Sequence, residues 1–194
     1  MTIAQAGVSF VDELFSNAWV VGGIVDAGAV VILFGSAAGI TGAGNLLTQT
    51  NAEPGDAFGS ALAAVDGTDL AVGAPGEDVG AAGGAGAVSL VADAGTTPNE
   101  TLLHQGVAGV VGTAEAGDVF GSAVIAGDFN QSEGLDSLAI GAPGEDVGAV
   151  GDAGAVNVRY APGFGGGGLA GDLEMHDRIR HDDLLSVRPG RICT

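Results

Sequence analysis

Paired carboxylates recur in this sequence at a fixed place within a duplicated motif. The residues GAPGEDVGA occur twice, at 73–81 and 141–149. Each copy carries an adjacent Glu-Asp pair, Glu77-Asp78 in the first and Glu145-Asp146 in the second. Two adjacent acids could exchange protons with a substrate. An active site is seldom copied in every unit of a repeat, so we expect these carboxylates to form an acidic turn along one rim of the fold.

Few other residues have the types and spacing that catalysis or metal binding needs. His176 and His181 lie among four acids near the C-terminus, a composition that can bind zinc or iron, but their spacing fits no helix face well. No nucleophile elbow, zinc-protease motif or phosphate-binding loop occurs. The single cysteine, Cys193, has no plausible catalytic partners. The sequence therefore predicts a protein that is not an enzyme.

The repeat extends well beyond the duplicated motif. Residues 55–67 (GDAFGSALAAVDG) match 117–129 (GDVFGSAVIAGDF), and 84–91 match 152–160. A partial third copy, DAGAVVILFGS, begins at Asp26. The repeating unit is about 60 residues long, and a recurrence of this length is typical of stacked or radial repeat folds.

Each full unit contains short segments rich in small and β-branched residues, bounded by Gly, Pro and Asp. The expected strands of the first unit are 58–64, 70–74, 85–91 and 101–104, and those of the second are 120–126, 137–142 and 153–160. Helical periodicity is absent from 20–160. Four antiparallel strands per unit are typical of a β-propeller blade. We therefore expect an all-β fold of propeller blades, two full and one partial, which together make an incomplete propeller.

This interpretation divides the chain into five parts. An N-terminal segment lies outside the repeats, and a Gly-rich linker with an irregular tail follows them. The predicted bounds are 1–19 for the N-terminal segment, 20–54 for the partial blade, 55–116 and 117–162 for the full blades, and 163–194 for the linker and tail.

The paired signatures Phe58-Gly59 with Gly73-Ala74-Pro75, and Phe120-Gly121 with Gly141-Ala142-Pro143, resemble the FG-GAP repeat. This repeat builds the seven-bladed propeller of integrin α subunits and occurs in many microbial surface proteins. The resemblance covers about residues 20–162. It implies that the aromatic residues of the signatures, Phe58 and Phe120, pack between blades.

The resemblance also implies one calcium site. In the family, the loop between the first two strands of a blade carries oxygen ligands at loop positions 1, 3, 5 and 9, with a backbone carbonyl at position 7. The loop at 128–136 reads DFNQSEGLD, which places Asp128, Asn130, Ser132 and Asp136 at the ligand positions and Gly134 at position 7. Calcium takes six to eight hard oxygens, and alternate residues of a tight loop can converge on one centre.

This loop departs from the family pattern at two positions. Ser132 stands where an acid is usual, and Glu133 replaces the usual glycine. Fewer formal charges predict weak binding, in the range of about 10⁻⁴–10⁻³ M. The alternative is a solvated polar turn without metal. The corresponding loop of the first unit, Asp66-Gly67-Thr68-Asp69, is too short to surround an ion and predicts a plain turn.

The charge balance restricts the possible partners. The chain has 194 residues with 24 acids, only five basic residues and a net charge of −19. A surface this acidic repels nucleic acid and anionic membranes, and it attracts divalent cations. The uncharged stretch at 27–52 holds many glycines and polar residues, so we expect strands there rather than a membrane span. Residues 1–25 do not show the pattern of a secretory signal.

We therefore expect a non-enzymatic, calcium-supported binding or adhesion module of an extracellular or cell-surface protein. Its ligand would be a protein or a glycan, and further blades or self-assembly would be needed to close the propeller. Two glycosylation sequons, at Asn99 and Asn130, fit this location. The alternatives are an accessory propeller of a secreted hydrolase, such as a phospholipase D-like enzyme, and a fragment without a function of its own.

Overall fold

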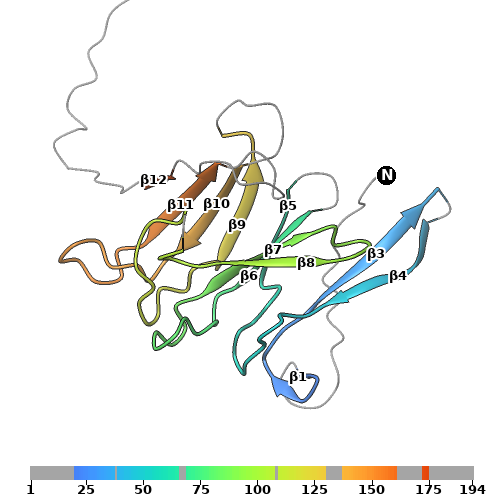
Figure 1. The fold of residues 1–194 in the computed structure, drawn as a ribbon, viewed down its shortest axis with the longest axis horizontal. Helices are drawn as coiled ribbons and strands as arrows, with labels where there is room; N and C mark the ends of the chain where they lie inside the picture. The colour runs from blue at the N-terminus through green and yellow to red at the C-terminus, as the bar shows by residue number, and fades with distance from the viewer. Residues whose placement is uncertain are drawn as a thin grey trace, which may run out of the picture.

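The computed structural model describes residues 20–37, 39–65, 69–107, 109–129, 137–160 and 172–174. All regular structure in these residues is β-strand, and every ladder between the strands is antiparallel. The strands form two four-stranded sheets and two hairpins. Figure 1 shows the β3–β4 hairpin, the β5–β8 sheet and the β9–β12 sheet following one another across the molecule in chain order. The expectation of an all-β fold is confirmed.

The middle sheet contains β5 (Ala61–Ala64), β6 (Leu70–Ala74), β7 (Ala87–Ala92) and β8 (Asn99–Leu103). Its strands lie side by side in chain order, so the sheet is a simple meander. All of β6 is buried, because this strand lies inside the sheet and both of its faces are covered. The short apolar run of β6 is what a doubly covered strand requires.

The last sheet repeats this meander with β9 (Ala123–Gly127), β10 (Ser137–Ala142), β11 (Ala155–Tyr160) and β12 (Asp172–Glu174). The sequence predicts the first three strands, with β10 at its exact bounds and with β9 and β11 beginning three and two residues later than predicted. The fourth strand was not expected, because β12 falls inside the part at 163–194 that reads as linker and tail. It pairs with β11 over Asn157–Arg159.

The N-terminal part is smaller. Strands β1 (Val20–Val21) and β2 (Ile24–Val25) form a tight hairpin, and β3 (Val30–Ser36) pairs with β4 (Gly39–Leu47). Strand β3 begins like β7, since Gly28-Ala29-Val30 corresponds to Gly86-Ala87-Val88. The β3–β4 hairpin therefore matches the second half of a four-stranded sheet. The uncharged stretch at 27–52 contains these two strands, and no described helix is long and apolar enough to cross a membrane.

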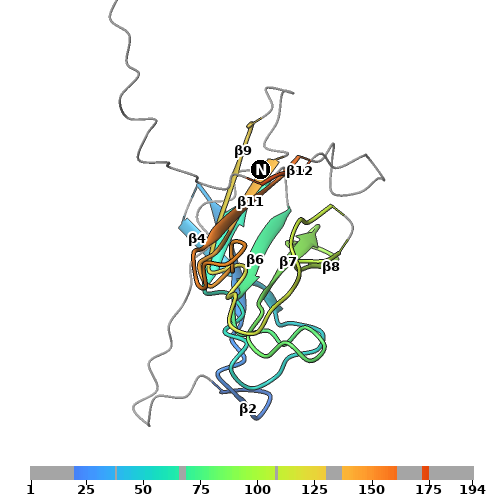
Figure 2. The same ribbon diagram turned by 90° about the vertical axis from the view of Figure 1, so that its left-hand side faces the viewer.

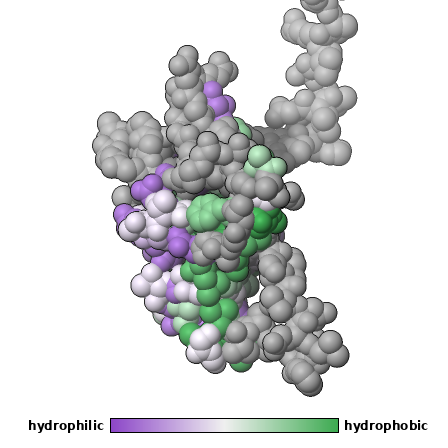
Figure 3. Space-filling view, turned by 90° about the vertical axis from the view of Figure 1, so that its right-hand side faces the viewer, coloured by the Kyte–Doolittle hydropathy of each residue, from purple (hydrophilic) through white to green (hydrophobic). Residues whose placement is uncertain are grey.

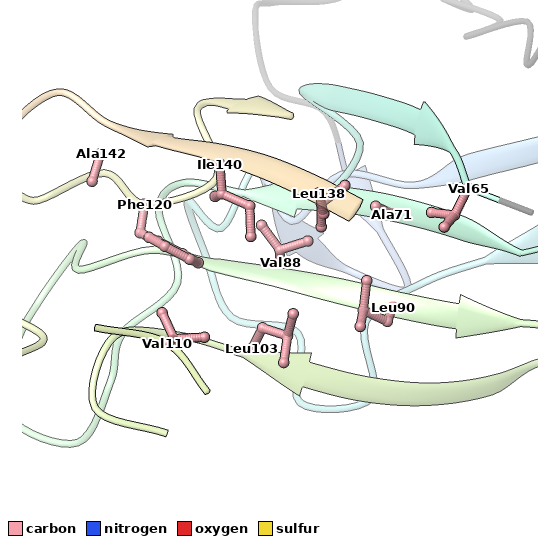
Figure 4. Packing of buried hydrophobic residues seen from close by; sticks show 10 residues of the cluster. All are labelled: Val65, Ala71, Val88, Leu90, Leu103, Val110, Phe120, Leu138, Ile140 and Ala142. Atoms are coloured by element: carbon pink, nitrogen blue, oxygen red, sulfur yellow. The ribbon is translucent and has the colours of Figure 1, made fainter. Parts of the chain in front are cut away.

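Two apolar clusters fill the spaces between successive sheets. One lies between the β3–β4 hairpin and the middle sheet and includes Val30, Phe58 and Val72. The other lies between the middle and last sheets, where Val88 and Leu90 meet side chains of the last sheet (Figure 4). Phe58 and Phe120 are 3% and 0% exposed, so the prediction that they pack between the repeating units is confirmed. The members from the last sheet and the segment before it are Phe120, Leu138, Ile140 and Ala142.

Backbone hydrogen bonds join each sheet to the one before it in the same way. Ahead of β5, the amides of Gly55, Ala57 and Phe58 donate to the carbonyls of residues 25, 26 and 27 at 2.9–3.1 Å. Ahead of β9, the amides of residues 117, 119 and 120 donate to the carbonyls of residues 83, 84 and 85 at 2.9–3.2 Å. These donor segments contain the GDxFG sequence, which explains why β5 and β9 begin three residues later than predicted.

Candidate functional site

The predicted calcium loop connects β9 to β10 at one end of the last sheet. Gly127 and Ser137, which flank the loop, are register partners in the ladder, so the loop leaves and re-enters the sheet at one point. Asp128 is the first loop residue and is exposed. The other predicted ligands, Asn130, Ser132, Gly134 and Asp136, lie outside the described residues. Across the described residues, no group of three or more His, Cys, Asp or Glu side chains is arranged to hold a metal ion.

The corresponding connection of the middle sheet is shorter in sequence. Residues 66–68 lie outside the described residues, but the two ends of the turn are held by hydrogen bonds. The amide of Val65 donates to the carbonyl of Asp69 at 3.0 Å, and the Asp69 Oδ1 accepts the amide of Asp93 at 3.0 Å. The Asp69 carboxylate thus braces the strand ends of its own sheet.

The repeated Glu-Asp pairs form the acidic turns that the sequence predicts only in part. Glu77 is only 2% exposed and lies at the contact between the β3–β4 hairpin and the middle sheet. Its Oε2 accepts a hydrogen bond from the side-chain amide of Gln49 at 2.5 Å, and its Oε1 accepts one from the side-chain amide of Asn51 at 2.5 Å. Both donors follow β4, so the carboxylate connects one repeating unit to the next. The expectation was wrong for Glu77 because its neighbours come from a preceding unit.

Glu145 repeats part of this arrangement one sheet later. Its Oε2 accepts a hydrogen bond at 2.5 Å from the side-chain amide of Gln105, a residue that follows β8. Gln105 corresponds to Gln49, and both glutamines are buried with an amide oxygen that makes no hydrogen bond. Residue 107 is a valine where the first copy has Asn51, so the second carboxylate lacks that donor. The sequence signal for this contact is a glutamine two residues after the end of β4 or β8.

The second acid of each pair holds its own turn together. Asp78 is exposed, and its Oδ1 accepts the amide of Gly84 at 2.7 Å. Asp146 is also exposed, and its Oδ1 accepts the amide of Asp152 at 2.8 Å. A local hydrogen bond from an aspartate to a nearby backbone amide stabilises a turn. For these two residues the expectation of an acidic turn is confirmed.

A second repeated carboxylate was missed by sequence reasoning. Asp56 and Asp118 are each 1% exposed, and their Oδ2 atoms accept the amides of Glu53 and Glu115 at 2.5 and 2.6 Å. Burial raises the pKa of both aspartates above the ordinary value of 3.8, against the opposing effect of these hydrogen bonds. The Glu-x-Gly-Asp spacing at both places was the available signal.

Burial is also the largest influence on Glu77. It raises the pKa of Glu77 above its ordinary value of 4.5, while the hydrogen bonds from Asn51 and Gln49 oppose the shift. Perturbed carboxylates can mark a catalytic site. Here Glu77 accepts side-chain amides of the preceding unit, whereas Asp56 and Asp118 accept backbone amides three residues earlier in their own segments, so the hydrogen bonds of all three carboxylates are structural.

No protein-family model matches this chain, and no curated protein matches it at a significant level. The FG-GAP resemblance therefore depends on the repeated residues themselves. Of the two sequons, Asn99 is an exposed residue at the start of β8, and Asn130 lies outside the described residues.

Proposed function

We propose that this chain is a non-enzymatic interaction module of propeller-blade-like sheets, in which a calcium ion stiffens the β9–β10 loop. The four-stranded meanders, their stacking in chain order and the repeated contacts between them support a blade-like arrangement. The fixed contacts between the sheets make the array a rigid support. Loops at the sheet ends are the parts of such a support that a ligand can reach.

One observation carries the calcium proposal. The DFNQSEGLD loop begins and ends at the paired residues Gly127 and Ser137, and Asp128 is exposed at its entry. A loop closed at both ends places alternate side chains around one centre at a smaller entropic cost than a free segment. Two carboxylates, one amide, one hydroxyl and one carbonyl make a hard-oxygen set that suits calcium.

The charge distribution supports a role outside nucleic-acid or lipid binding. The net charge of −19 disfavours polyanionic partners and favours cations. A protein or glycan ligand at a cell surface or in the extracellular medium fits this surface, with calcium holding the loop that meets it. The described carboxylates with raised pKa values accept structural hydrogen bonds, which favours binding over catalysis.

Calcium titration of two matched variants tests this function. Asp128→Asn removes a predicted ligand, and Glu133→Gln removes one charge from the same loop at a position that the pattern does not assign to the metal. We expect isothermal titration calorimetry to show calcium binding in the range of about 10⁻⁴–10⁻³ M for the wild type and for Glu133→Gln, and at least tenfold weaker binding for Asp128→Asn. Equal loss in both variants would indicate diffuse attraction to negative charge and would reject the site.

A further inference from the structure

The outer face of the last sheet repeats a surface that is covered at two other places in the molecule. We call this surface, on the side of β9–β12 that points away from the middle sheet, the last face. Val124 and Ala126 pack toward the middle sheet, so Ile125 between them points to the last face. Val156 lies on the same face, because its equivalent Val88 points toward the sheet that follows. Figure 2 shows the molecule with its β9–β12 end nearest the viewer.

In the described part of the chain, exposure shows that nothing covers the last face as its counterparts are covered. Val30 and Val88, which occupy equivalent positions in β3 and β7, are 1% and 0% exposed, whereas Val156 is 44% exposed. Ile125 is 59% exposed, whereas the equivalent Ala63 packs against the core between the middle and last sheets. The sequence has kept apolar side chains at positions that are buried in the other units.

The backbone that would receive a further unit already has the docking conformation. In the acceptor segment at 25–28, φ is 55° at Asp26 and 80° at Gly28, and in the segment at 83–86 it is 61° at Gly84 and 83° at Gly86. The equivalent segment at 151–154 has a φ of 52° at Asp152 and 78° at Gly154. In the first two segments, three carbonyls accept amides of the next unit. In the third, the carbonyls of residues 151, 152 and 153 accept no backbone hydrogen bond from the described residues.

Large apolar side chains are exposed at both ends of the array and not in its middle. The exposed set on the last unit is Ile125, Phe129, Val150 and Val156, and the set on the first unit is Val25, Ile40 and Leu46. The described part of the middle unit contributes no member. Figure 3, viewed from the β3–β4 end, shows an apolar stripe on that side of the molecule. A contact between the two ends of different copies would bury both sets together.

The geometry points to a second copy of this chain as the occupant of the last face, bound head to tail through its N-terminal end. The occupant must bring successive backbone donors and an aromatic side chain, as the acid-x-Phe sequences at 56–58 and 118–120 do within the chain. The chain contains a third acid-x-Phe sequence, Glu13-Leu14-Phe15, which lacks the two glycines of GDxFG and lies ahead of β1, outside the described residues. It is the segment that a second copy would offer.

The same segment is too short to reach the last face of its own chain. Four residues separate Phe15 from Val20, and an extended chain over these five steps spans at most about 18 Å. The middle and last sheets both lie between the β3–β4 hairpin and the last face. Packed sheets are about 10 Å apart, so two sheets put the last face beyond this reach. The contact is therefore between copies. A head-to-tail contact of this kind makes a closed ring or an open filament.

Two singly blocked variants of the full-length chain test the proposal. Val156→Glu blocks the last face, and Phe15→Glu blocks the N-terminal end. Thr97→Glu, which adds the same charge to an exposed turn of the middle unit, is the control. We expect light scattering after size exclusion to show assemblies for the wild type and for Thr97→Glu, and a single-chain mass for each blocked variant. An equimolar mixture of the two blocked variants should give a mass of two chains, because one intact head and one intact tail remain.

Other outcomes would overturn the proposal. A wild type that stays at the mass of one chain at every concentration shows that the last face does not bind a second copy. Dimers of Phe15→Glu alone show that two last faces meet symmetrically, which contradicts the head-to-tail contact. Circular dichroism of each variant checks that the strands remain, and Val156 is exposed enough that its charge does not enter the core. Calcium binding by Asp128 is measured separately, so failure of one proposal leaves the other intact.

Discussion

The middle and last sheets share sequence and topology but differ in what covers them. Both contain the motif GAPGEDVGA, and both are four-stranded meanders. The middle sheet accepts hydrogen bonds from the GDxFG segment of the following unit, and the last sheet has the equivalent acceptor segment at 151–154. In the middle sheet Gly73 and Val88 are buried, whereas in the last sheet Gly141 is half-buried and Val156 is exposed. The comparison teaches that sequence sets the local geometry of each unit and that the next unit decides its burial.

Equivalent glycines in the two sheets provide the strongest test of this difference. A Cβ added to Gly73 would collide with the carbonyl of Gly121 in the following unit, whereas one added to Gly141 would meet Ala123 Cβ at an ordinary 3.6 Å. We expect Gly73→Ala to lower the free energy of unfolding by about 3 kcal/mol, because the backbone has to move. Gly141→Ala should change it by less than about 0.5 kcal/mol. Urea denaturation of both variants measures the difference, and equal losses would mean that the two sheets are covered alike.

Equivalent valines give a smaller effect in the same direction. Val88→Ala removes fully buried methyl groups between the middle and last sheets, so we expect a loss of about 2 kcal/mol. Val156→Ala should cost less than about 0.5 kcal/mol in chains diluted enough to be single, since this side chain is already 44% exposed. Denaturation at high protein concentration sharpens the comparison, because assembly through the last face would make the cost of Val156→Ala rise with concentration.

The smallest expected effect is the pH dependence of stability that comes from the equivalent buried aspartates, one in each full unit. Burial raises the pKa of Asp56 and Asp118 in the folded state, so the folded chain holds more protons than the unfolded chain just above the ordinary pKa of 3.8. Stability from this source is present below that value and is lost as the pH rises through the raised pKa. Tm should therefore increase as the pH is lowered through the raised pKa toward the ordinary value.

The double variant Asp56→Asn/Asp118→Asn separates this effect from the general repulsion among acids. Asparagine keeps an oxygen that can accept the amides of Glu53 and Glu115, but it does not titrate. We expect the variant to show a weaker dependence of Tm on pH than the wild type above the ordinary pKa of 3.8. An unchanged slope would assign the pH dependence to the exposed acids instead.

Much of the fold could be predicted from particular stretches of sequence. The predicted strand at 70–74 coincides with β6, because its apolar run is bounded by turn residues on both sides. The strands predicted from Phe58 and Phe120 begin three residues later in the structure, because the amides of these two phenylalanines donate to carbonyls of the preceding unit. Strand β12 was missed because Asp172-Leu173-Glu174 carries no apolar pattern and pairs only through β11.

The sequence by itself determined the repeat, the all-β class, the order of strands within each unit and the positions of the turns. These features follow from local spacing of small, β-branched and turn-forming residues, which the chain states directly. Tertiary structure alone decided that Glu77 is buried while Asp78 is exposed, that Gln49 and Gln105 bridge successive units, and that Val156 stays uncovered. Burial depends on neighbours from other units, and identical residues therefore have different surroundings in identical motifs.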